Sequence, residues 1–120
     1  MADLIIKIAD NVAEIESAQR LRYEVFNLEF GRGLAASRSS GMDQDRYDSI
    51  CDHLIVFDRV RGMAVGTNRL LLSSRLSGQD RFDSENEFDL TAIRNLRGEI
   101  LEMGRACVHK NYRTGGTINM

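Results

Sequence analysis

The deciding stretch of this sequence is Glu99-Ile-Leu-Glu-Met-Gly-Arg-Ala-Cys-Val108, an apolar run that Glu102 and Arg105 interrupt. A run of this length with a β-branched end predicts a strand over residues 99–108. In a regular strand, two residues three apart point to opposite faces, so Glu102 and Arg105 would lie on different faces. Gly104 between them favours a β-bulge that redirects one side chain, which is common beside active sites.

The residues that follow, Lys110-Asn-Tyr-Arg-Thr-Gly-Gly-Thr-Ile118, are typical of a turn that leads into a helix. Backbone amides at the start of a helix often hold phosphate. A strand and a Gly-rich turn normally introduce a helix that covers the sheet, but this sequence stops at Met120. We therefore expect residues 1–120 to form a single, incomplete domain, from a truncated gene or a deliberately shortened protein.

Upstream, the sequence predicts a short strand and a long helix. Leu4-Ile-Ile-Lys-Ile8 is typical of a buried strand. Asn11 with Glu14 resembles a capping box, and apolar residues then recur at helical spacing until Gly31. The recurring residues are Val12, Ile15, Ala18, Leu21, Val25 and Leu28.

Two hairpin strands and two loops account for most of the remaining sequence. Residues 53–58 and 63–72 predict an antiparallel hairpin. Residues 31–51 lack periodicity and are rich in small residues, so we expect a loop that is mobile without substrate. A polar loop over residues 73–87 precedes a short helix at 88–96. The order of elements predicts an α+β fold, with a mostly antiparallel sheet and a long first helix.

The composition excludes several classes of protein. With 42% hydrophobic and 28% charged residues, the chain does not resemble a disordered protein. A net charge of −2 gives no bulk attraction to nucleic acid or to an anionic membrane. Cys51 and Cys107 have no neighbours at ligand spacing, so we expect two free thiols in a reducing cytoplasm and no metal site. No apolar run reaches the length needed to span a membrane, so we expect a cytoplasmic protein.

Two charged clusters are candidates for chemistry. Arg22 and Phe26 lie one helical turn apart and could grip a carboxylate or a ring-bearing substrate, or could be an arginine packed over a core phenylalanine. Four aspartates follow the first loop, at Asp43, Asp45, Asp48 and Asp52. Their spacing suggests calcium, but the segment lacks the glycine and the final glutamate of an EF-hand. The alternatives are a solvated acidic turn and pairing with buried arginines.

Arg69 lies in the middle of an otherwise apolar strand, where an unpaired cation would be costly. It therefore predicts a carboxylate partner. Glu102 and Arg105 raise the same expectation, because both interrupt a run that should be buried. Several buried arginines with carboxylates are compatible with two interpretations, a structural ion-pair network and an active-site cluster.

The order and spacing of several motifs resemble the GNAT-fold N-acyltransferases. The motifs are Arg22-x-x-x-Phe26, Asp45-x-x-Asp48, Gly66-Thr-Asn-Arg69-Leu-Leu, Glu87-Phe-Asp-Leu90 and Leu101-Glu-Met-Gly-Arg-Ala-Cys-Val108 with Tyr112-Arg113 after it. Within that group the chain is most similar to the ornithine N-acyltransferases of ornithine-lipid synthesis and their hemolysin-like relatives. It is more distantly similar to the acyl-homoserine-lactone autoinducer synthases. The resemblance covers nearly the whole chain from about residue 20.

The resemblance implies transfer of a fatty acyl group, often 3-hydroxyacyl, from an acyl carrier protein or CoA thioester to the amine of an amino acid such as ornithine. No metal or redox cofactor is implied. By position, Glu102 matches the proposed general base. The charged and aromatic substrate site is matched by Arg22, Phe26, Asp45, Asp48, Arg69 and Arg105. The pantetheine strand and phosphate turn are matched by Ala106, Cys107, Val108, Arg113, Gly115 and Gly116. The turn departs from the family pattern at its last place, where Ile118 replaces Gly or Ala.

Members of this family continue through a helix and further strands after the phosphate turn. Two alternatives to an ornithine acyltransferase therefore stay open, an autoinducer synthase and an inactive fragment that only binds acyl carrier protein. The acidic surface of a carrier protein would suit four basic residues, Arg94, Arg97, Lys110 and Arg113. We also expect marginal stability, or self-association through the exposed edge of the strand at residues 100–108.

Overall fold

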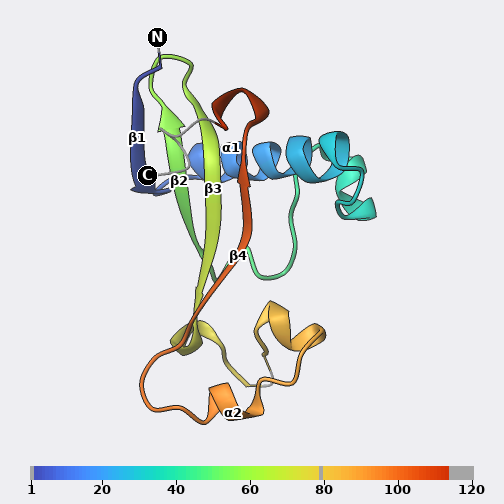
Figure 1. Ribbon diagram of the computed structural model, residues 1–120, viewed down its shortest axis with the longest axis vertical. Coiled ribbons are helices and arrows are strands. Elements are labelled where there is room, and N and C mark those ends of the chain that lie inside the picture. The colour runs from blue at the N-terminus through green and yellow to red at the C-terminus, as the bar shows by residue number, and fades with distance from the viewer. Residues whose placement is uncertain (1, 79, 114–120) are drawn as a thin grey trace.

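The computed structural model describes residues 2–78 and 80–113 as one antiparallel sheet crossed by a long helix (Figure 1). The four strands lie in the order β1-β2-β3-β4. Their bounds are Leu4–Ile8 for β1, Asp52–Asp58 for β2, Met63–Leu72 for β3 and Leu101–Val108 for β4. The predicted α+β class, the hairpin of β2 with β3, and the final strand beside it are confirmed.

The long helix consists of the α-helix α1 over Val12–Arg22 and a π-helical continuation over Tyr23–Glu29. The predicted cap is confirmed, because Asn11 Oδ1 accepts the Glu14 N–H at 2.9 Å. Gly31 follows the end of the helix with φ +65°, a conformation that glycine adopts without strain. The sequence pattern gave no sign of the π-helical half, which carries Phe26.

The apolar spacing of this helix marks its buried centre but not its ends. Ala18, Leu21 and Val25 are buried. Val12 and Leu28, which continue the same spacing, are in contrast 69% and 66% exposed. Each lies beyond the part of the helix that rests on the sheet, where a position on the apolar stripe meets solvent instead of strands.

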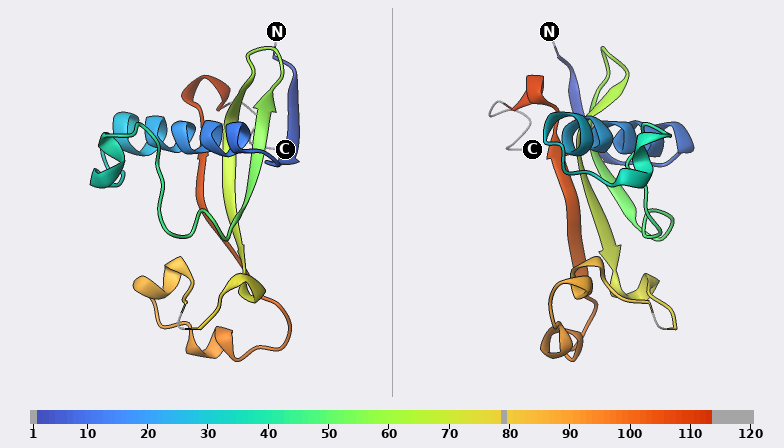
Figure 2. Two further views of the ribbon diagram at one scale, coloured as in Figure 1. Left: turned by 180° about the vertical axis from the view of Figure 1, so that it is seen from behind. Right: turned by 90° about the vertical axis from the view of Figure 1, so that its right-hand side faces the viewer.

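Helix α1 lies across one face of the sheet, and Figure 2 shows this arrangement from two further directions. Beneath it, Ala18 packs with Ile55 and Ala64. A second cluster extends the core on the same face, and it consists of Tyr47, Cys51, Leu71 and Phe82. The small side chains of Ala18 on α1 and Ala64 on β3 let helix and sheet approach closely, while the larger side chains of the second cluster fill the space beyond the helix.

The opposite face of the sheet is also apolar but more open. A third cluster joins Val56 and Val65 to Tyr112 near one end. Farther along, Ile6 is 46% exposed and Met103 is 64% exposed. Strand β1 was predicted to be buried, but it is an edge strand whose residues are half-buried or exposed, because it pairs only with β2 in the described part of the chain.

The two predicted loops contain short helical turns. The first includes a 3₁₀ helix at Ala35–Arg38. The second extends past the ends of β3 and β4 and includes 3₁₀ helices at Ser73–Arg75 and Asp83–Asn86 (Figure 1). The helix predicted at 88–96 is shorter than expected, since α2 spans only Thr91–Arg94. Among the described residues, no helix is both long and apolar enough to cross a membrane.

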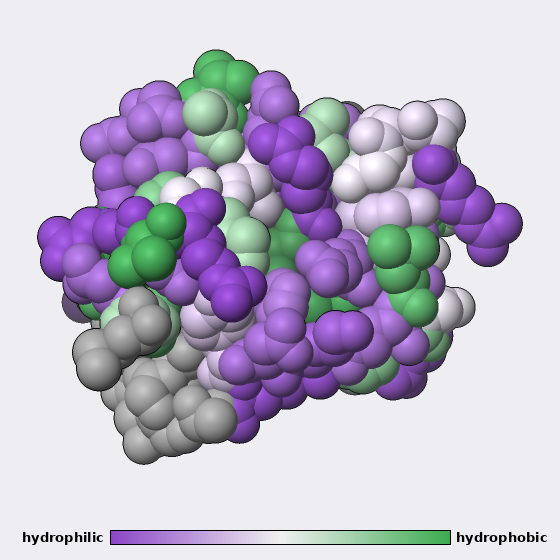
Figure 3. Space-filling view, turned by 90° about the horizontal axis from the view of Figure 1, so that it is seen from above, coloured by the Kyte–Doolittle hydropathy of each residue, from purple (hydrophilic) through white to green (hydrophobic). Residues whose placement is uncertain are grey.

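The surface seen from above is mostly hydrophilic, and its apolar side chains form separate patches (Figure 3). The large apolar side chains of the sheet that are exposed belong to β1 and β4, and they are Ile6, Ile8, Leu101 and Met103. Strand β4 also has a hydrogen-bonded neighbour on one side only within the described residues. An edge of this kind offers unpaired backbone groups to a second chain.

We predict that the chain self-associates through β4, and that Met103→Lys weakens this association. A lysine on an edge strand disfavours pairing because its charge would have to be desolvated. Sedimentation velocity over a range of protein concentrations measures the effect. Val60→Lys is the matched control, because Val60 is 68% exposed in the turn between β2 and β3. A wild-type chain that stays monomeric at every concentration would contradict the prediction.

Candidate active site

A β-bulge interrupts the pairing of β3 with β4. The register passes from Thr67↔Cys107 to Arg69↔Gly104, so Arg105 and Ala106 lie opposite a single residue of β3. The predicted bulge is therefore confirmed. It turns the Arg105 side chain toward the face that α1 covers, where Arg105 contacts Asp43. Glu102 lies on the same face, because it pairs in register with the core residue Leu71.

The Arg22 side chain is completely buried and points at two carboxylates. Its Nε donates to Asp43 Oδ2 at 2.8 Å, and its Nη2 donates to Asp48 Oδ1 at 2.9 Å. Nη2 also contacts the Asp43 carbonyl. Burial opposes ionisation of Asp48, but the charges of Arg22 and Arg69 and the Asp45 N–H hold its pKa below the usual range. Asp48 is therefore a stable anion within the core.

Arg69 finds the carboxylate partner that its apolar strand predicted. Its Nη1 lies 2.6 Å from Asp45 and 3.2 Å from Asp48, and its Nη2 lies 3.4 Å from Asp83. Its guanidinium carbon is 5.5 Å from the centre of the Tyr47 ring. Burial lowers the pKa of Arg69, yet the hydrogen bond to Asp45 and the charges of Asp45 and Asp48 together outweigh this effect, so the pKa is raised.

Arg105 completes the network from β4. It forms an ion pair with Asp43, and its Nε lies 3.1 Å from Asp43 Oδ2. Its guanidinium carbon lies 4.5 Å from the centre of the Phe26 ring, so Phe26 stacks on Arg105. Among the open interpretations of the four aspartates, pairing with buried arginines is confirmed for Asp43, Asp45 and Asp48, whereas Asp52 pairs with the exposed Arg75. No group of three or more metal-ligating side chains occurs among residues 2–78 and 80–113.

Glu102 is half-buried and is held by backbone amides. Its two carboxylate oxygens accept the N–H groups of Asp83 and Ser84, at 3.1 and 2.7 Å. No ion pair joins it to Arg69 or Arg105 within the described part of the chain. The contact secures the 3₁₀ helix at Asp83–Asn86 to the start of β4. A carboxylate held in this way is oriented but not neutralised by a cation.

The residues predicted for the acyl donor lie at and beyond the bulge. A cavity of about 300 Å³ borders Ala106, Cys107 and Val108 and is otherwise lined by residues of β1, β2 and β3, including Ile6, Leu54, Gly66 and Asn68. It opens on the face opposite α1, because its side chains alternate with those that face the helix. Burial raises the pKa of Cys107 to about 12, so this thiol stays protonated at neutral pH.

The segment after β4 is fixed to the rest of the molecule by two side-chain contacts. Tyr112 Oη donates to Asp58 Oδ2 at 2.7 Å, which lowers the pKa of Asp58 and raises that of Tyr112. Arg113 forms two bonds of 2.6 Å to Glu29 at the end of the π-helix. The predicted site residues Gly115 and Gly116 lie outside the described residues.

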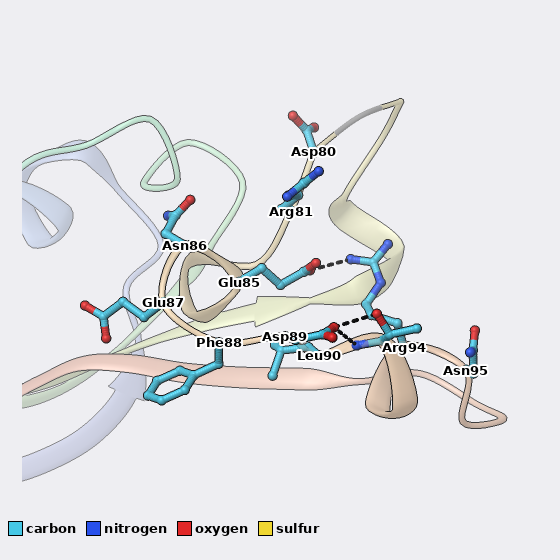
Figure 4. Close-up of a pocket in the computed structure, with 11 residues that line it drawn as sticks. Asp80, Arg81, Glu85, Asn86, Glu87, Phe88, Asp89, Leu90, Arg94 and Asn95 are labelled. Carbon is cyan, nitrogen blue, oxygen red and sulfur yellow. Dashed lines mark hydrogen bonds and ion pairs between the residues drawn. The ribbon is translucent and has the colours of Figure 1, made fainter.

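A second, more open pocket lies away from this cluster, over residues 80–95 (Figure 4). Its volume is about 760 Å³ and it is open and polar. Figure 4 shows Glu85 pointing at Arg94, and these side chains form an ion pair of 2.9 Å. None of the predicted substrate or donor residues lines this pocket.

Asp43 was not among the substrate-site residues predicted from the sequence, although it is one of the four aspartates that follow the first loop. The structure places Asp43 between Arg22 and Arg105 with 1% of its surface exposed. The structure brings together all six residues predicted for the substrate, either directly or through Asp43. Asp45 joins the same cluster through Arg69. Whether these residues contact a substrate stays a prediction.

Comparison with known proteins identifies the family of this chain. The acetyltransferase (GNAT) domain matches residues 21–120, which is most of the chain. The chain belongs to the GNAT acetyltransferase family. The crystal structure of the AHL synthase LasI superposes with a TM-score of 0.59 over 96% of this chain and 58% of LasI. At 13% identity, this similarity shows a shared fold.

This GNAT chain is also similar to curated proteins that share one name. It is 36% identical over 121 residues to the L-ornithine N(alpha)-acyltransferase of Rhodobacter capsulatus, which covers 96% of this chain and 47% of that protein. The proteins of the same name from Brucella abortus and Agrobacterium fabrum are 35% and 37% identical, over 100% and 95% of this chain and 46% and 42% of their own lengths. This GNAT chain therefore spans about half the length of the curated relatives it matches.

We predict that the free energy of unfolding falls as the pH is lowered from about 5 to about 3. Asp48 and Asp58 have lower pKa values when folded than the ordinary value near 3.9, so unfolding takes up protons in acid. Their contribution is complete above the unfolded pKa and is lost as the pH falls through the folded pKa. Urea denaturation at each pH measures it.

Asp58→Asn should make this pH dependence shallower, because the amide keeps a partner for Tyr112 but does not titrate. Asp10→Asn is the control, since the side chain of Asp10 is 70% exposed. Equal slopes in the wild-type and Asp58→Asn chains would show that Asp58 does not contribute.

Proposed function

We propose that this chain is the N-terminal part of an enzyme that transfers a fatty acyl group, often 3-hydroxyacyl, from an acyl carrier protein thioester to the α-amine of ornithine. The observation that carries this proposal is the 36% identity, over nearly the whole chain, to proteins named L-ornithine N(alpha)-acyltransferase. Membership of the GNAT family supports the reaction class. The bulged β4, with a carboxylate on one face and an apolar cavity on the other, is consistent with that chemistry.

Each step of the proposed reaction has a candidate group in this chain. The ammonium of the acceptor gives a proton to the Glu102 carboxylate, and the free amine attacks the thioester carbonyl. The oxyanion that forms needs backbone N–H donors, and a bulge in β4 frees such groups from the strand ladder. The attacking nitrogen then loses its extra proton, the C–S bond breaks as the amide forms, and the pantetheine sulfur takes up a proton and leaves as the thiol.

The two faces of the sheet suggest how the substrates approach the bulge. Glu102 and the arginine–aspartate network lie on the α1 face, which suits a charged amino acid. The cavity beside Ala106 and Val108 is apolar and suits the acyl chain. The amine and the thioester would thus meet at β4 from opposite sides. A carrier protein would dock on Arg94, Arg97, Lys110 and Arg113, all of which are exposed.

The proposed function is tested by an acyl-transfer assay on two proteins, this chain and a chimaera that continues after Tyr112 with the C-terminal part of the Rhodobacter capsulatus relative. Each is mixed with ornithine and 3-hydroxyacyl carrier protein, and mass spectrometry detects N-acylornithine. We expect product from the chimaera. Failure of the chimaera while the intact relative is active contradicts the proposal. A product formed only when an autoinducer precursor replaces ornithine as the acceptor would favour the autoinducer synthase. Binding of the carrier protein without any product would favour the inactive fragment that only binds the carrier.

We predict that Glu102→Gln lowers the acyl-transfer rate of the chimaera by roughly 10²- to 10⁴-fold, because the amide cannot accept the amine's proton. The amide also leaves one of the two N–H donors poorly paired, which should cost about 1–3 kcal/mol of folding stability. Rate and urea denaturation are measured on the same preparation.

Glu99→Gln is the matched control for Glu102→Gln. Glu99 also accepts a backbone N–H, from Ser74 at 3.0 Å, but it is exposed and precedes the strand. Its replacement should leave the rate per folded molecule unchanged. If Glu102→Gln is equally active per folded molecule, Glu102 serves only to hold the 83–86 segment.

A further inference from the structure

Arg105 adopts a backbone conformation that arginine normally avoids. Its φ is +51°, and among the described residues it is the only one other than glycine with a positive φ. For a residue with a side chain, this left-handed region costs free energy, and it persists only where the surroundings enforce it. The neighbouring Gly104, which could adopt the conformation without strain, does not have it. Something other than local preference therefore holds Arg105 in place.

The conformation decides the direction of the Arg105 side chain. Arg105 and Ala106 together oppose Asn68, the single residue between Thr67 and Arg69 on β3. With regular pairing, Arg105 would face away from α1, because Glu102 faces toward it. The left-handed residue shifts the alternation and brings the guanidinium to the α1 face.

Two side chains hold the guanidinium there. Asp43 binds it through both carboxylate oxygens, with the Nε of Arg105 3.1 Å from Oδ2. Phe26 stacks on its plane with a separation of 4.5 Å. Phe26 comes from the π-helix, and Asp43 is tied to α1 because its N–H donates to the Gln19 carbonyl at 2.9 Å.

Asp43 is itself fixed from a second direction. Arg22 donates to the same Oδ2 atom at 2.8 Å, and both side chains are buried. The contacts with Arg22 and with the Gln19 carbonyl therefore position Asp43, and its carboxylate also binds Arg105. Buried charges with so many partners move only together, so the helix determines where the Arg105 side chain can go.

We propose that Asp43 and Phe26 are positioning residues, which hold Arg105 in the left-handed conformation and thereby maintain the bulge of β4. This assigns Phe26 a role without substrate contact. What the bulge binds rests on the proposed function, whereas the clamp on Arg105 is a property of this chain alone. An experiment can therefore contradict the proposed function without contradicting the clamp on Arg105, and the reverse.

The test measures the conformation of residue 105 by NMR in the full 120-residue chain. The intraresidue HN–Hα NOE is strong when φ is positive and weak in an extended strand. Phe26→Leu removes the ring face, and Phe26→Tyr keeps it. We expect Phe26→Leu to weaken the NOE of Arg105 by about twofold or more, and Phe26→Tyr to retain it. Asp43→Asn should weaken it as well.

Asp45→Asn is the control for Asp43→Asn. It removes the 2.6 Å ion pair of Arg69 from the same network, but Asp45 has no bond to Arg105. It should leave the NOE unchanged. An unchanged NOE in both Phe26→Leu and Asp43→Asn overturns the proposal, as does an equal loss in Asp45→Asn. If Asp43→Asn does not fold, the comparison of Phe26→Leu with Phe26→Tyr decides alone.

Arg105→Gly provides a second test of the clamp, because glycine adopts a positive φ without strain and needs no side chain to hold it there. In the wild-type background, Asp43→Asn should shift the amide resonances of Gly104 and Ala106. In the Arg105→Gly background, the same change should shift them far less. Equal shifts in both backgrounds would show that Asp43 acts on this strand by another route and would overturn the clamp.

Discussion

Three arginines, two of them buried and one half-buried, converge on one short segment, residues 43–48, and this convergence holds the structure together. Arg22 comes from α1, Arg69 from β3 and Arg105 from β4. Their partners Asp43, Asp45 and Asp48 carry three negative charges against three positive ones. Removing one member of a buried pair typically costs about 3–5 kcal/mol, because the remaining charge stays desolvated. A segment without regular secondary structure therefore fixes the positions of a helix and two strands.

The network also separates two environments across a single strand. On the α1 side, β4 presents Glu102 and Arg105 among other charged groups. On the other side, its neighbours include the apolar cavity and the exposed Met103. A reaction that joins a charged amino acid to a fatty chain needs both environments within a few ångströms. The bulge allows this, because it breaks the strict alternation of a strand at one residue.

Much of the fold follows from local signals in the sequence. The Asn11 cap, Gly31 at the helix end and the hairpin turn each act through nearby residues, and each is confirmed. The partner of Arg69 was also predictable in kind, since a cation in an apolar strand requires a carboxylate. These signals depend on chemistry within a few residues or on the cost of burial alone.

The remaining features depend on contacts between distant parts of the chain. The π-helix at Tyr23–Glu29 has no local signature, and neither does the amide cradle of Glu102, which comes from residues 83 and 84. Which aspartate meets which arginine is decided by how the loop packs. Residues 31–51 read as one mobile loop, yet Asp43, Tyr47 and Asp48 are buried or nearly so, with side chains tied to arginines.

The separation of Asp43 from its two cations along the chain has a consequence for the order of assembly during synthesis. Arg22 precedes Asp43 by 21 residues, whereas Arg105 follows it by 62. Chains emerge from the ribosome N-terminus first, at about 5–20 residues per second, so the helix and its aspartate can meet several seconds before β4 exists. Strand β4 is then added to a carboxylate that Arg22 has already positioned, and Arg105 pairs with it.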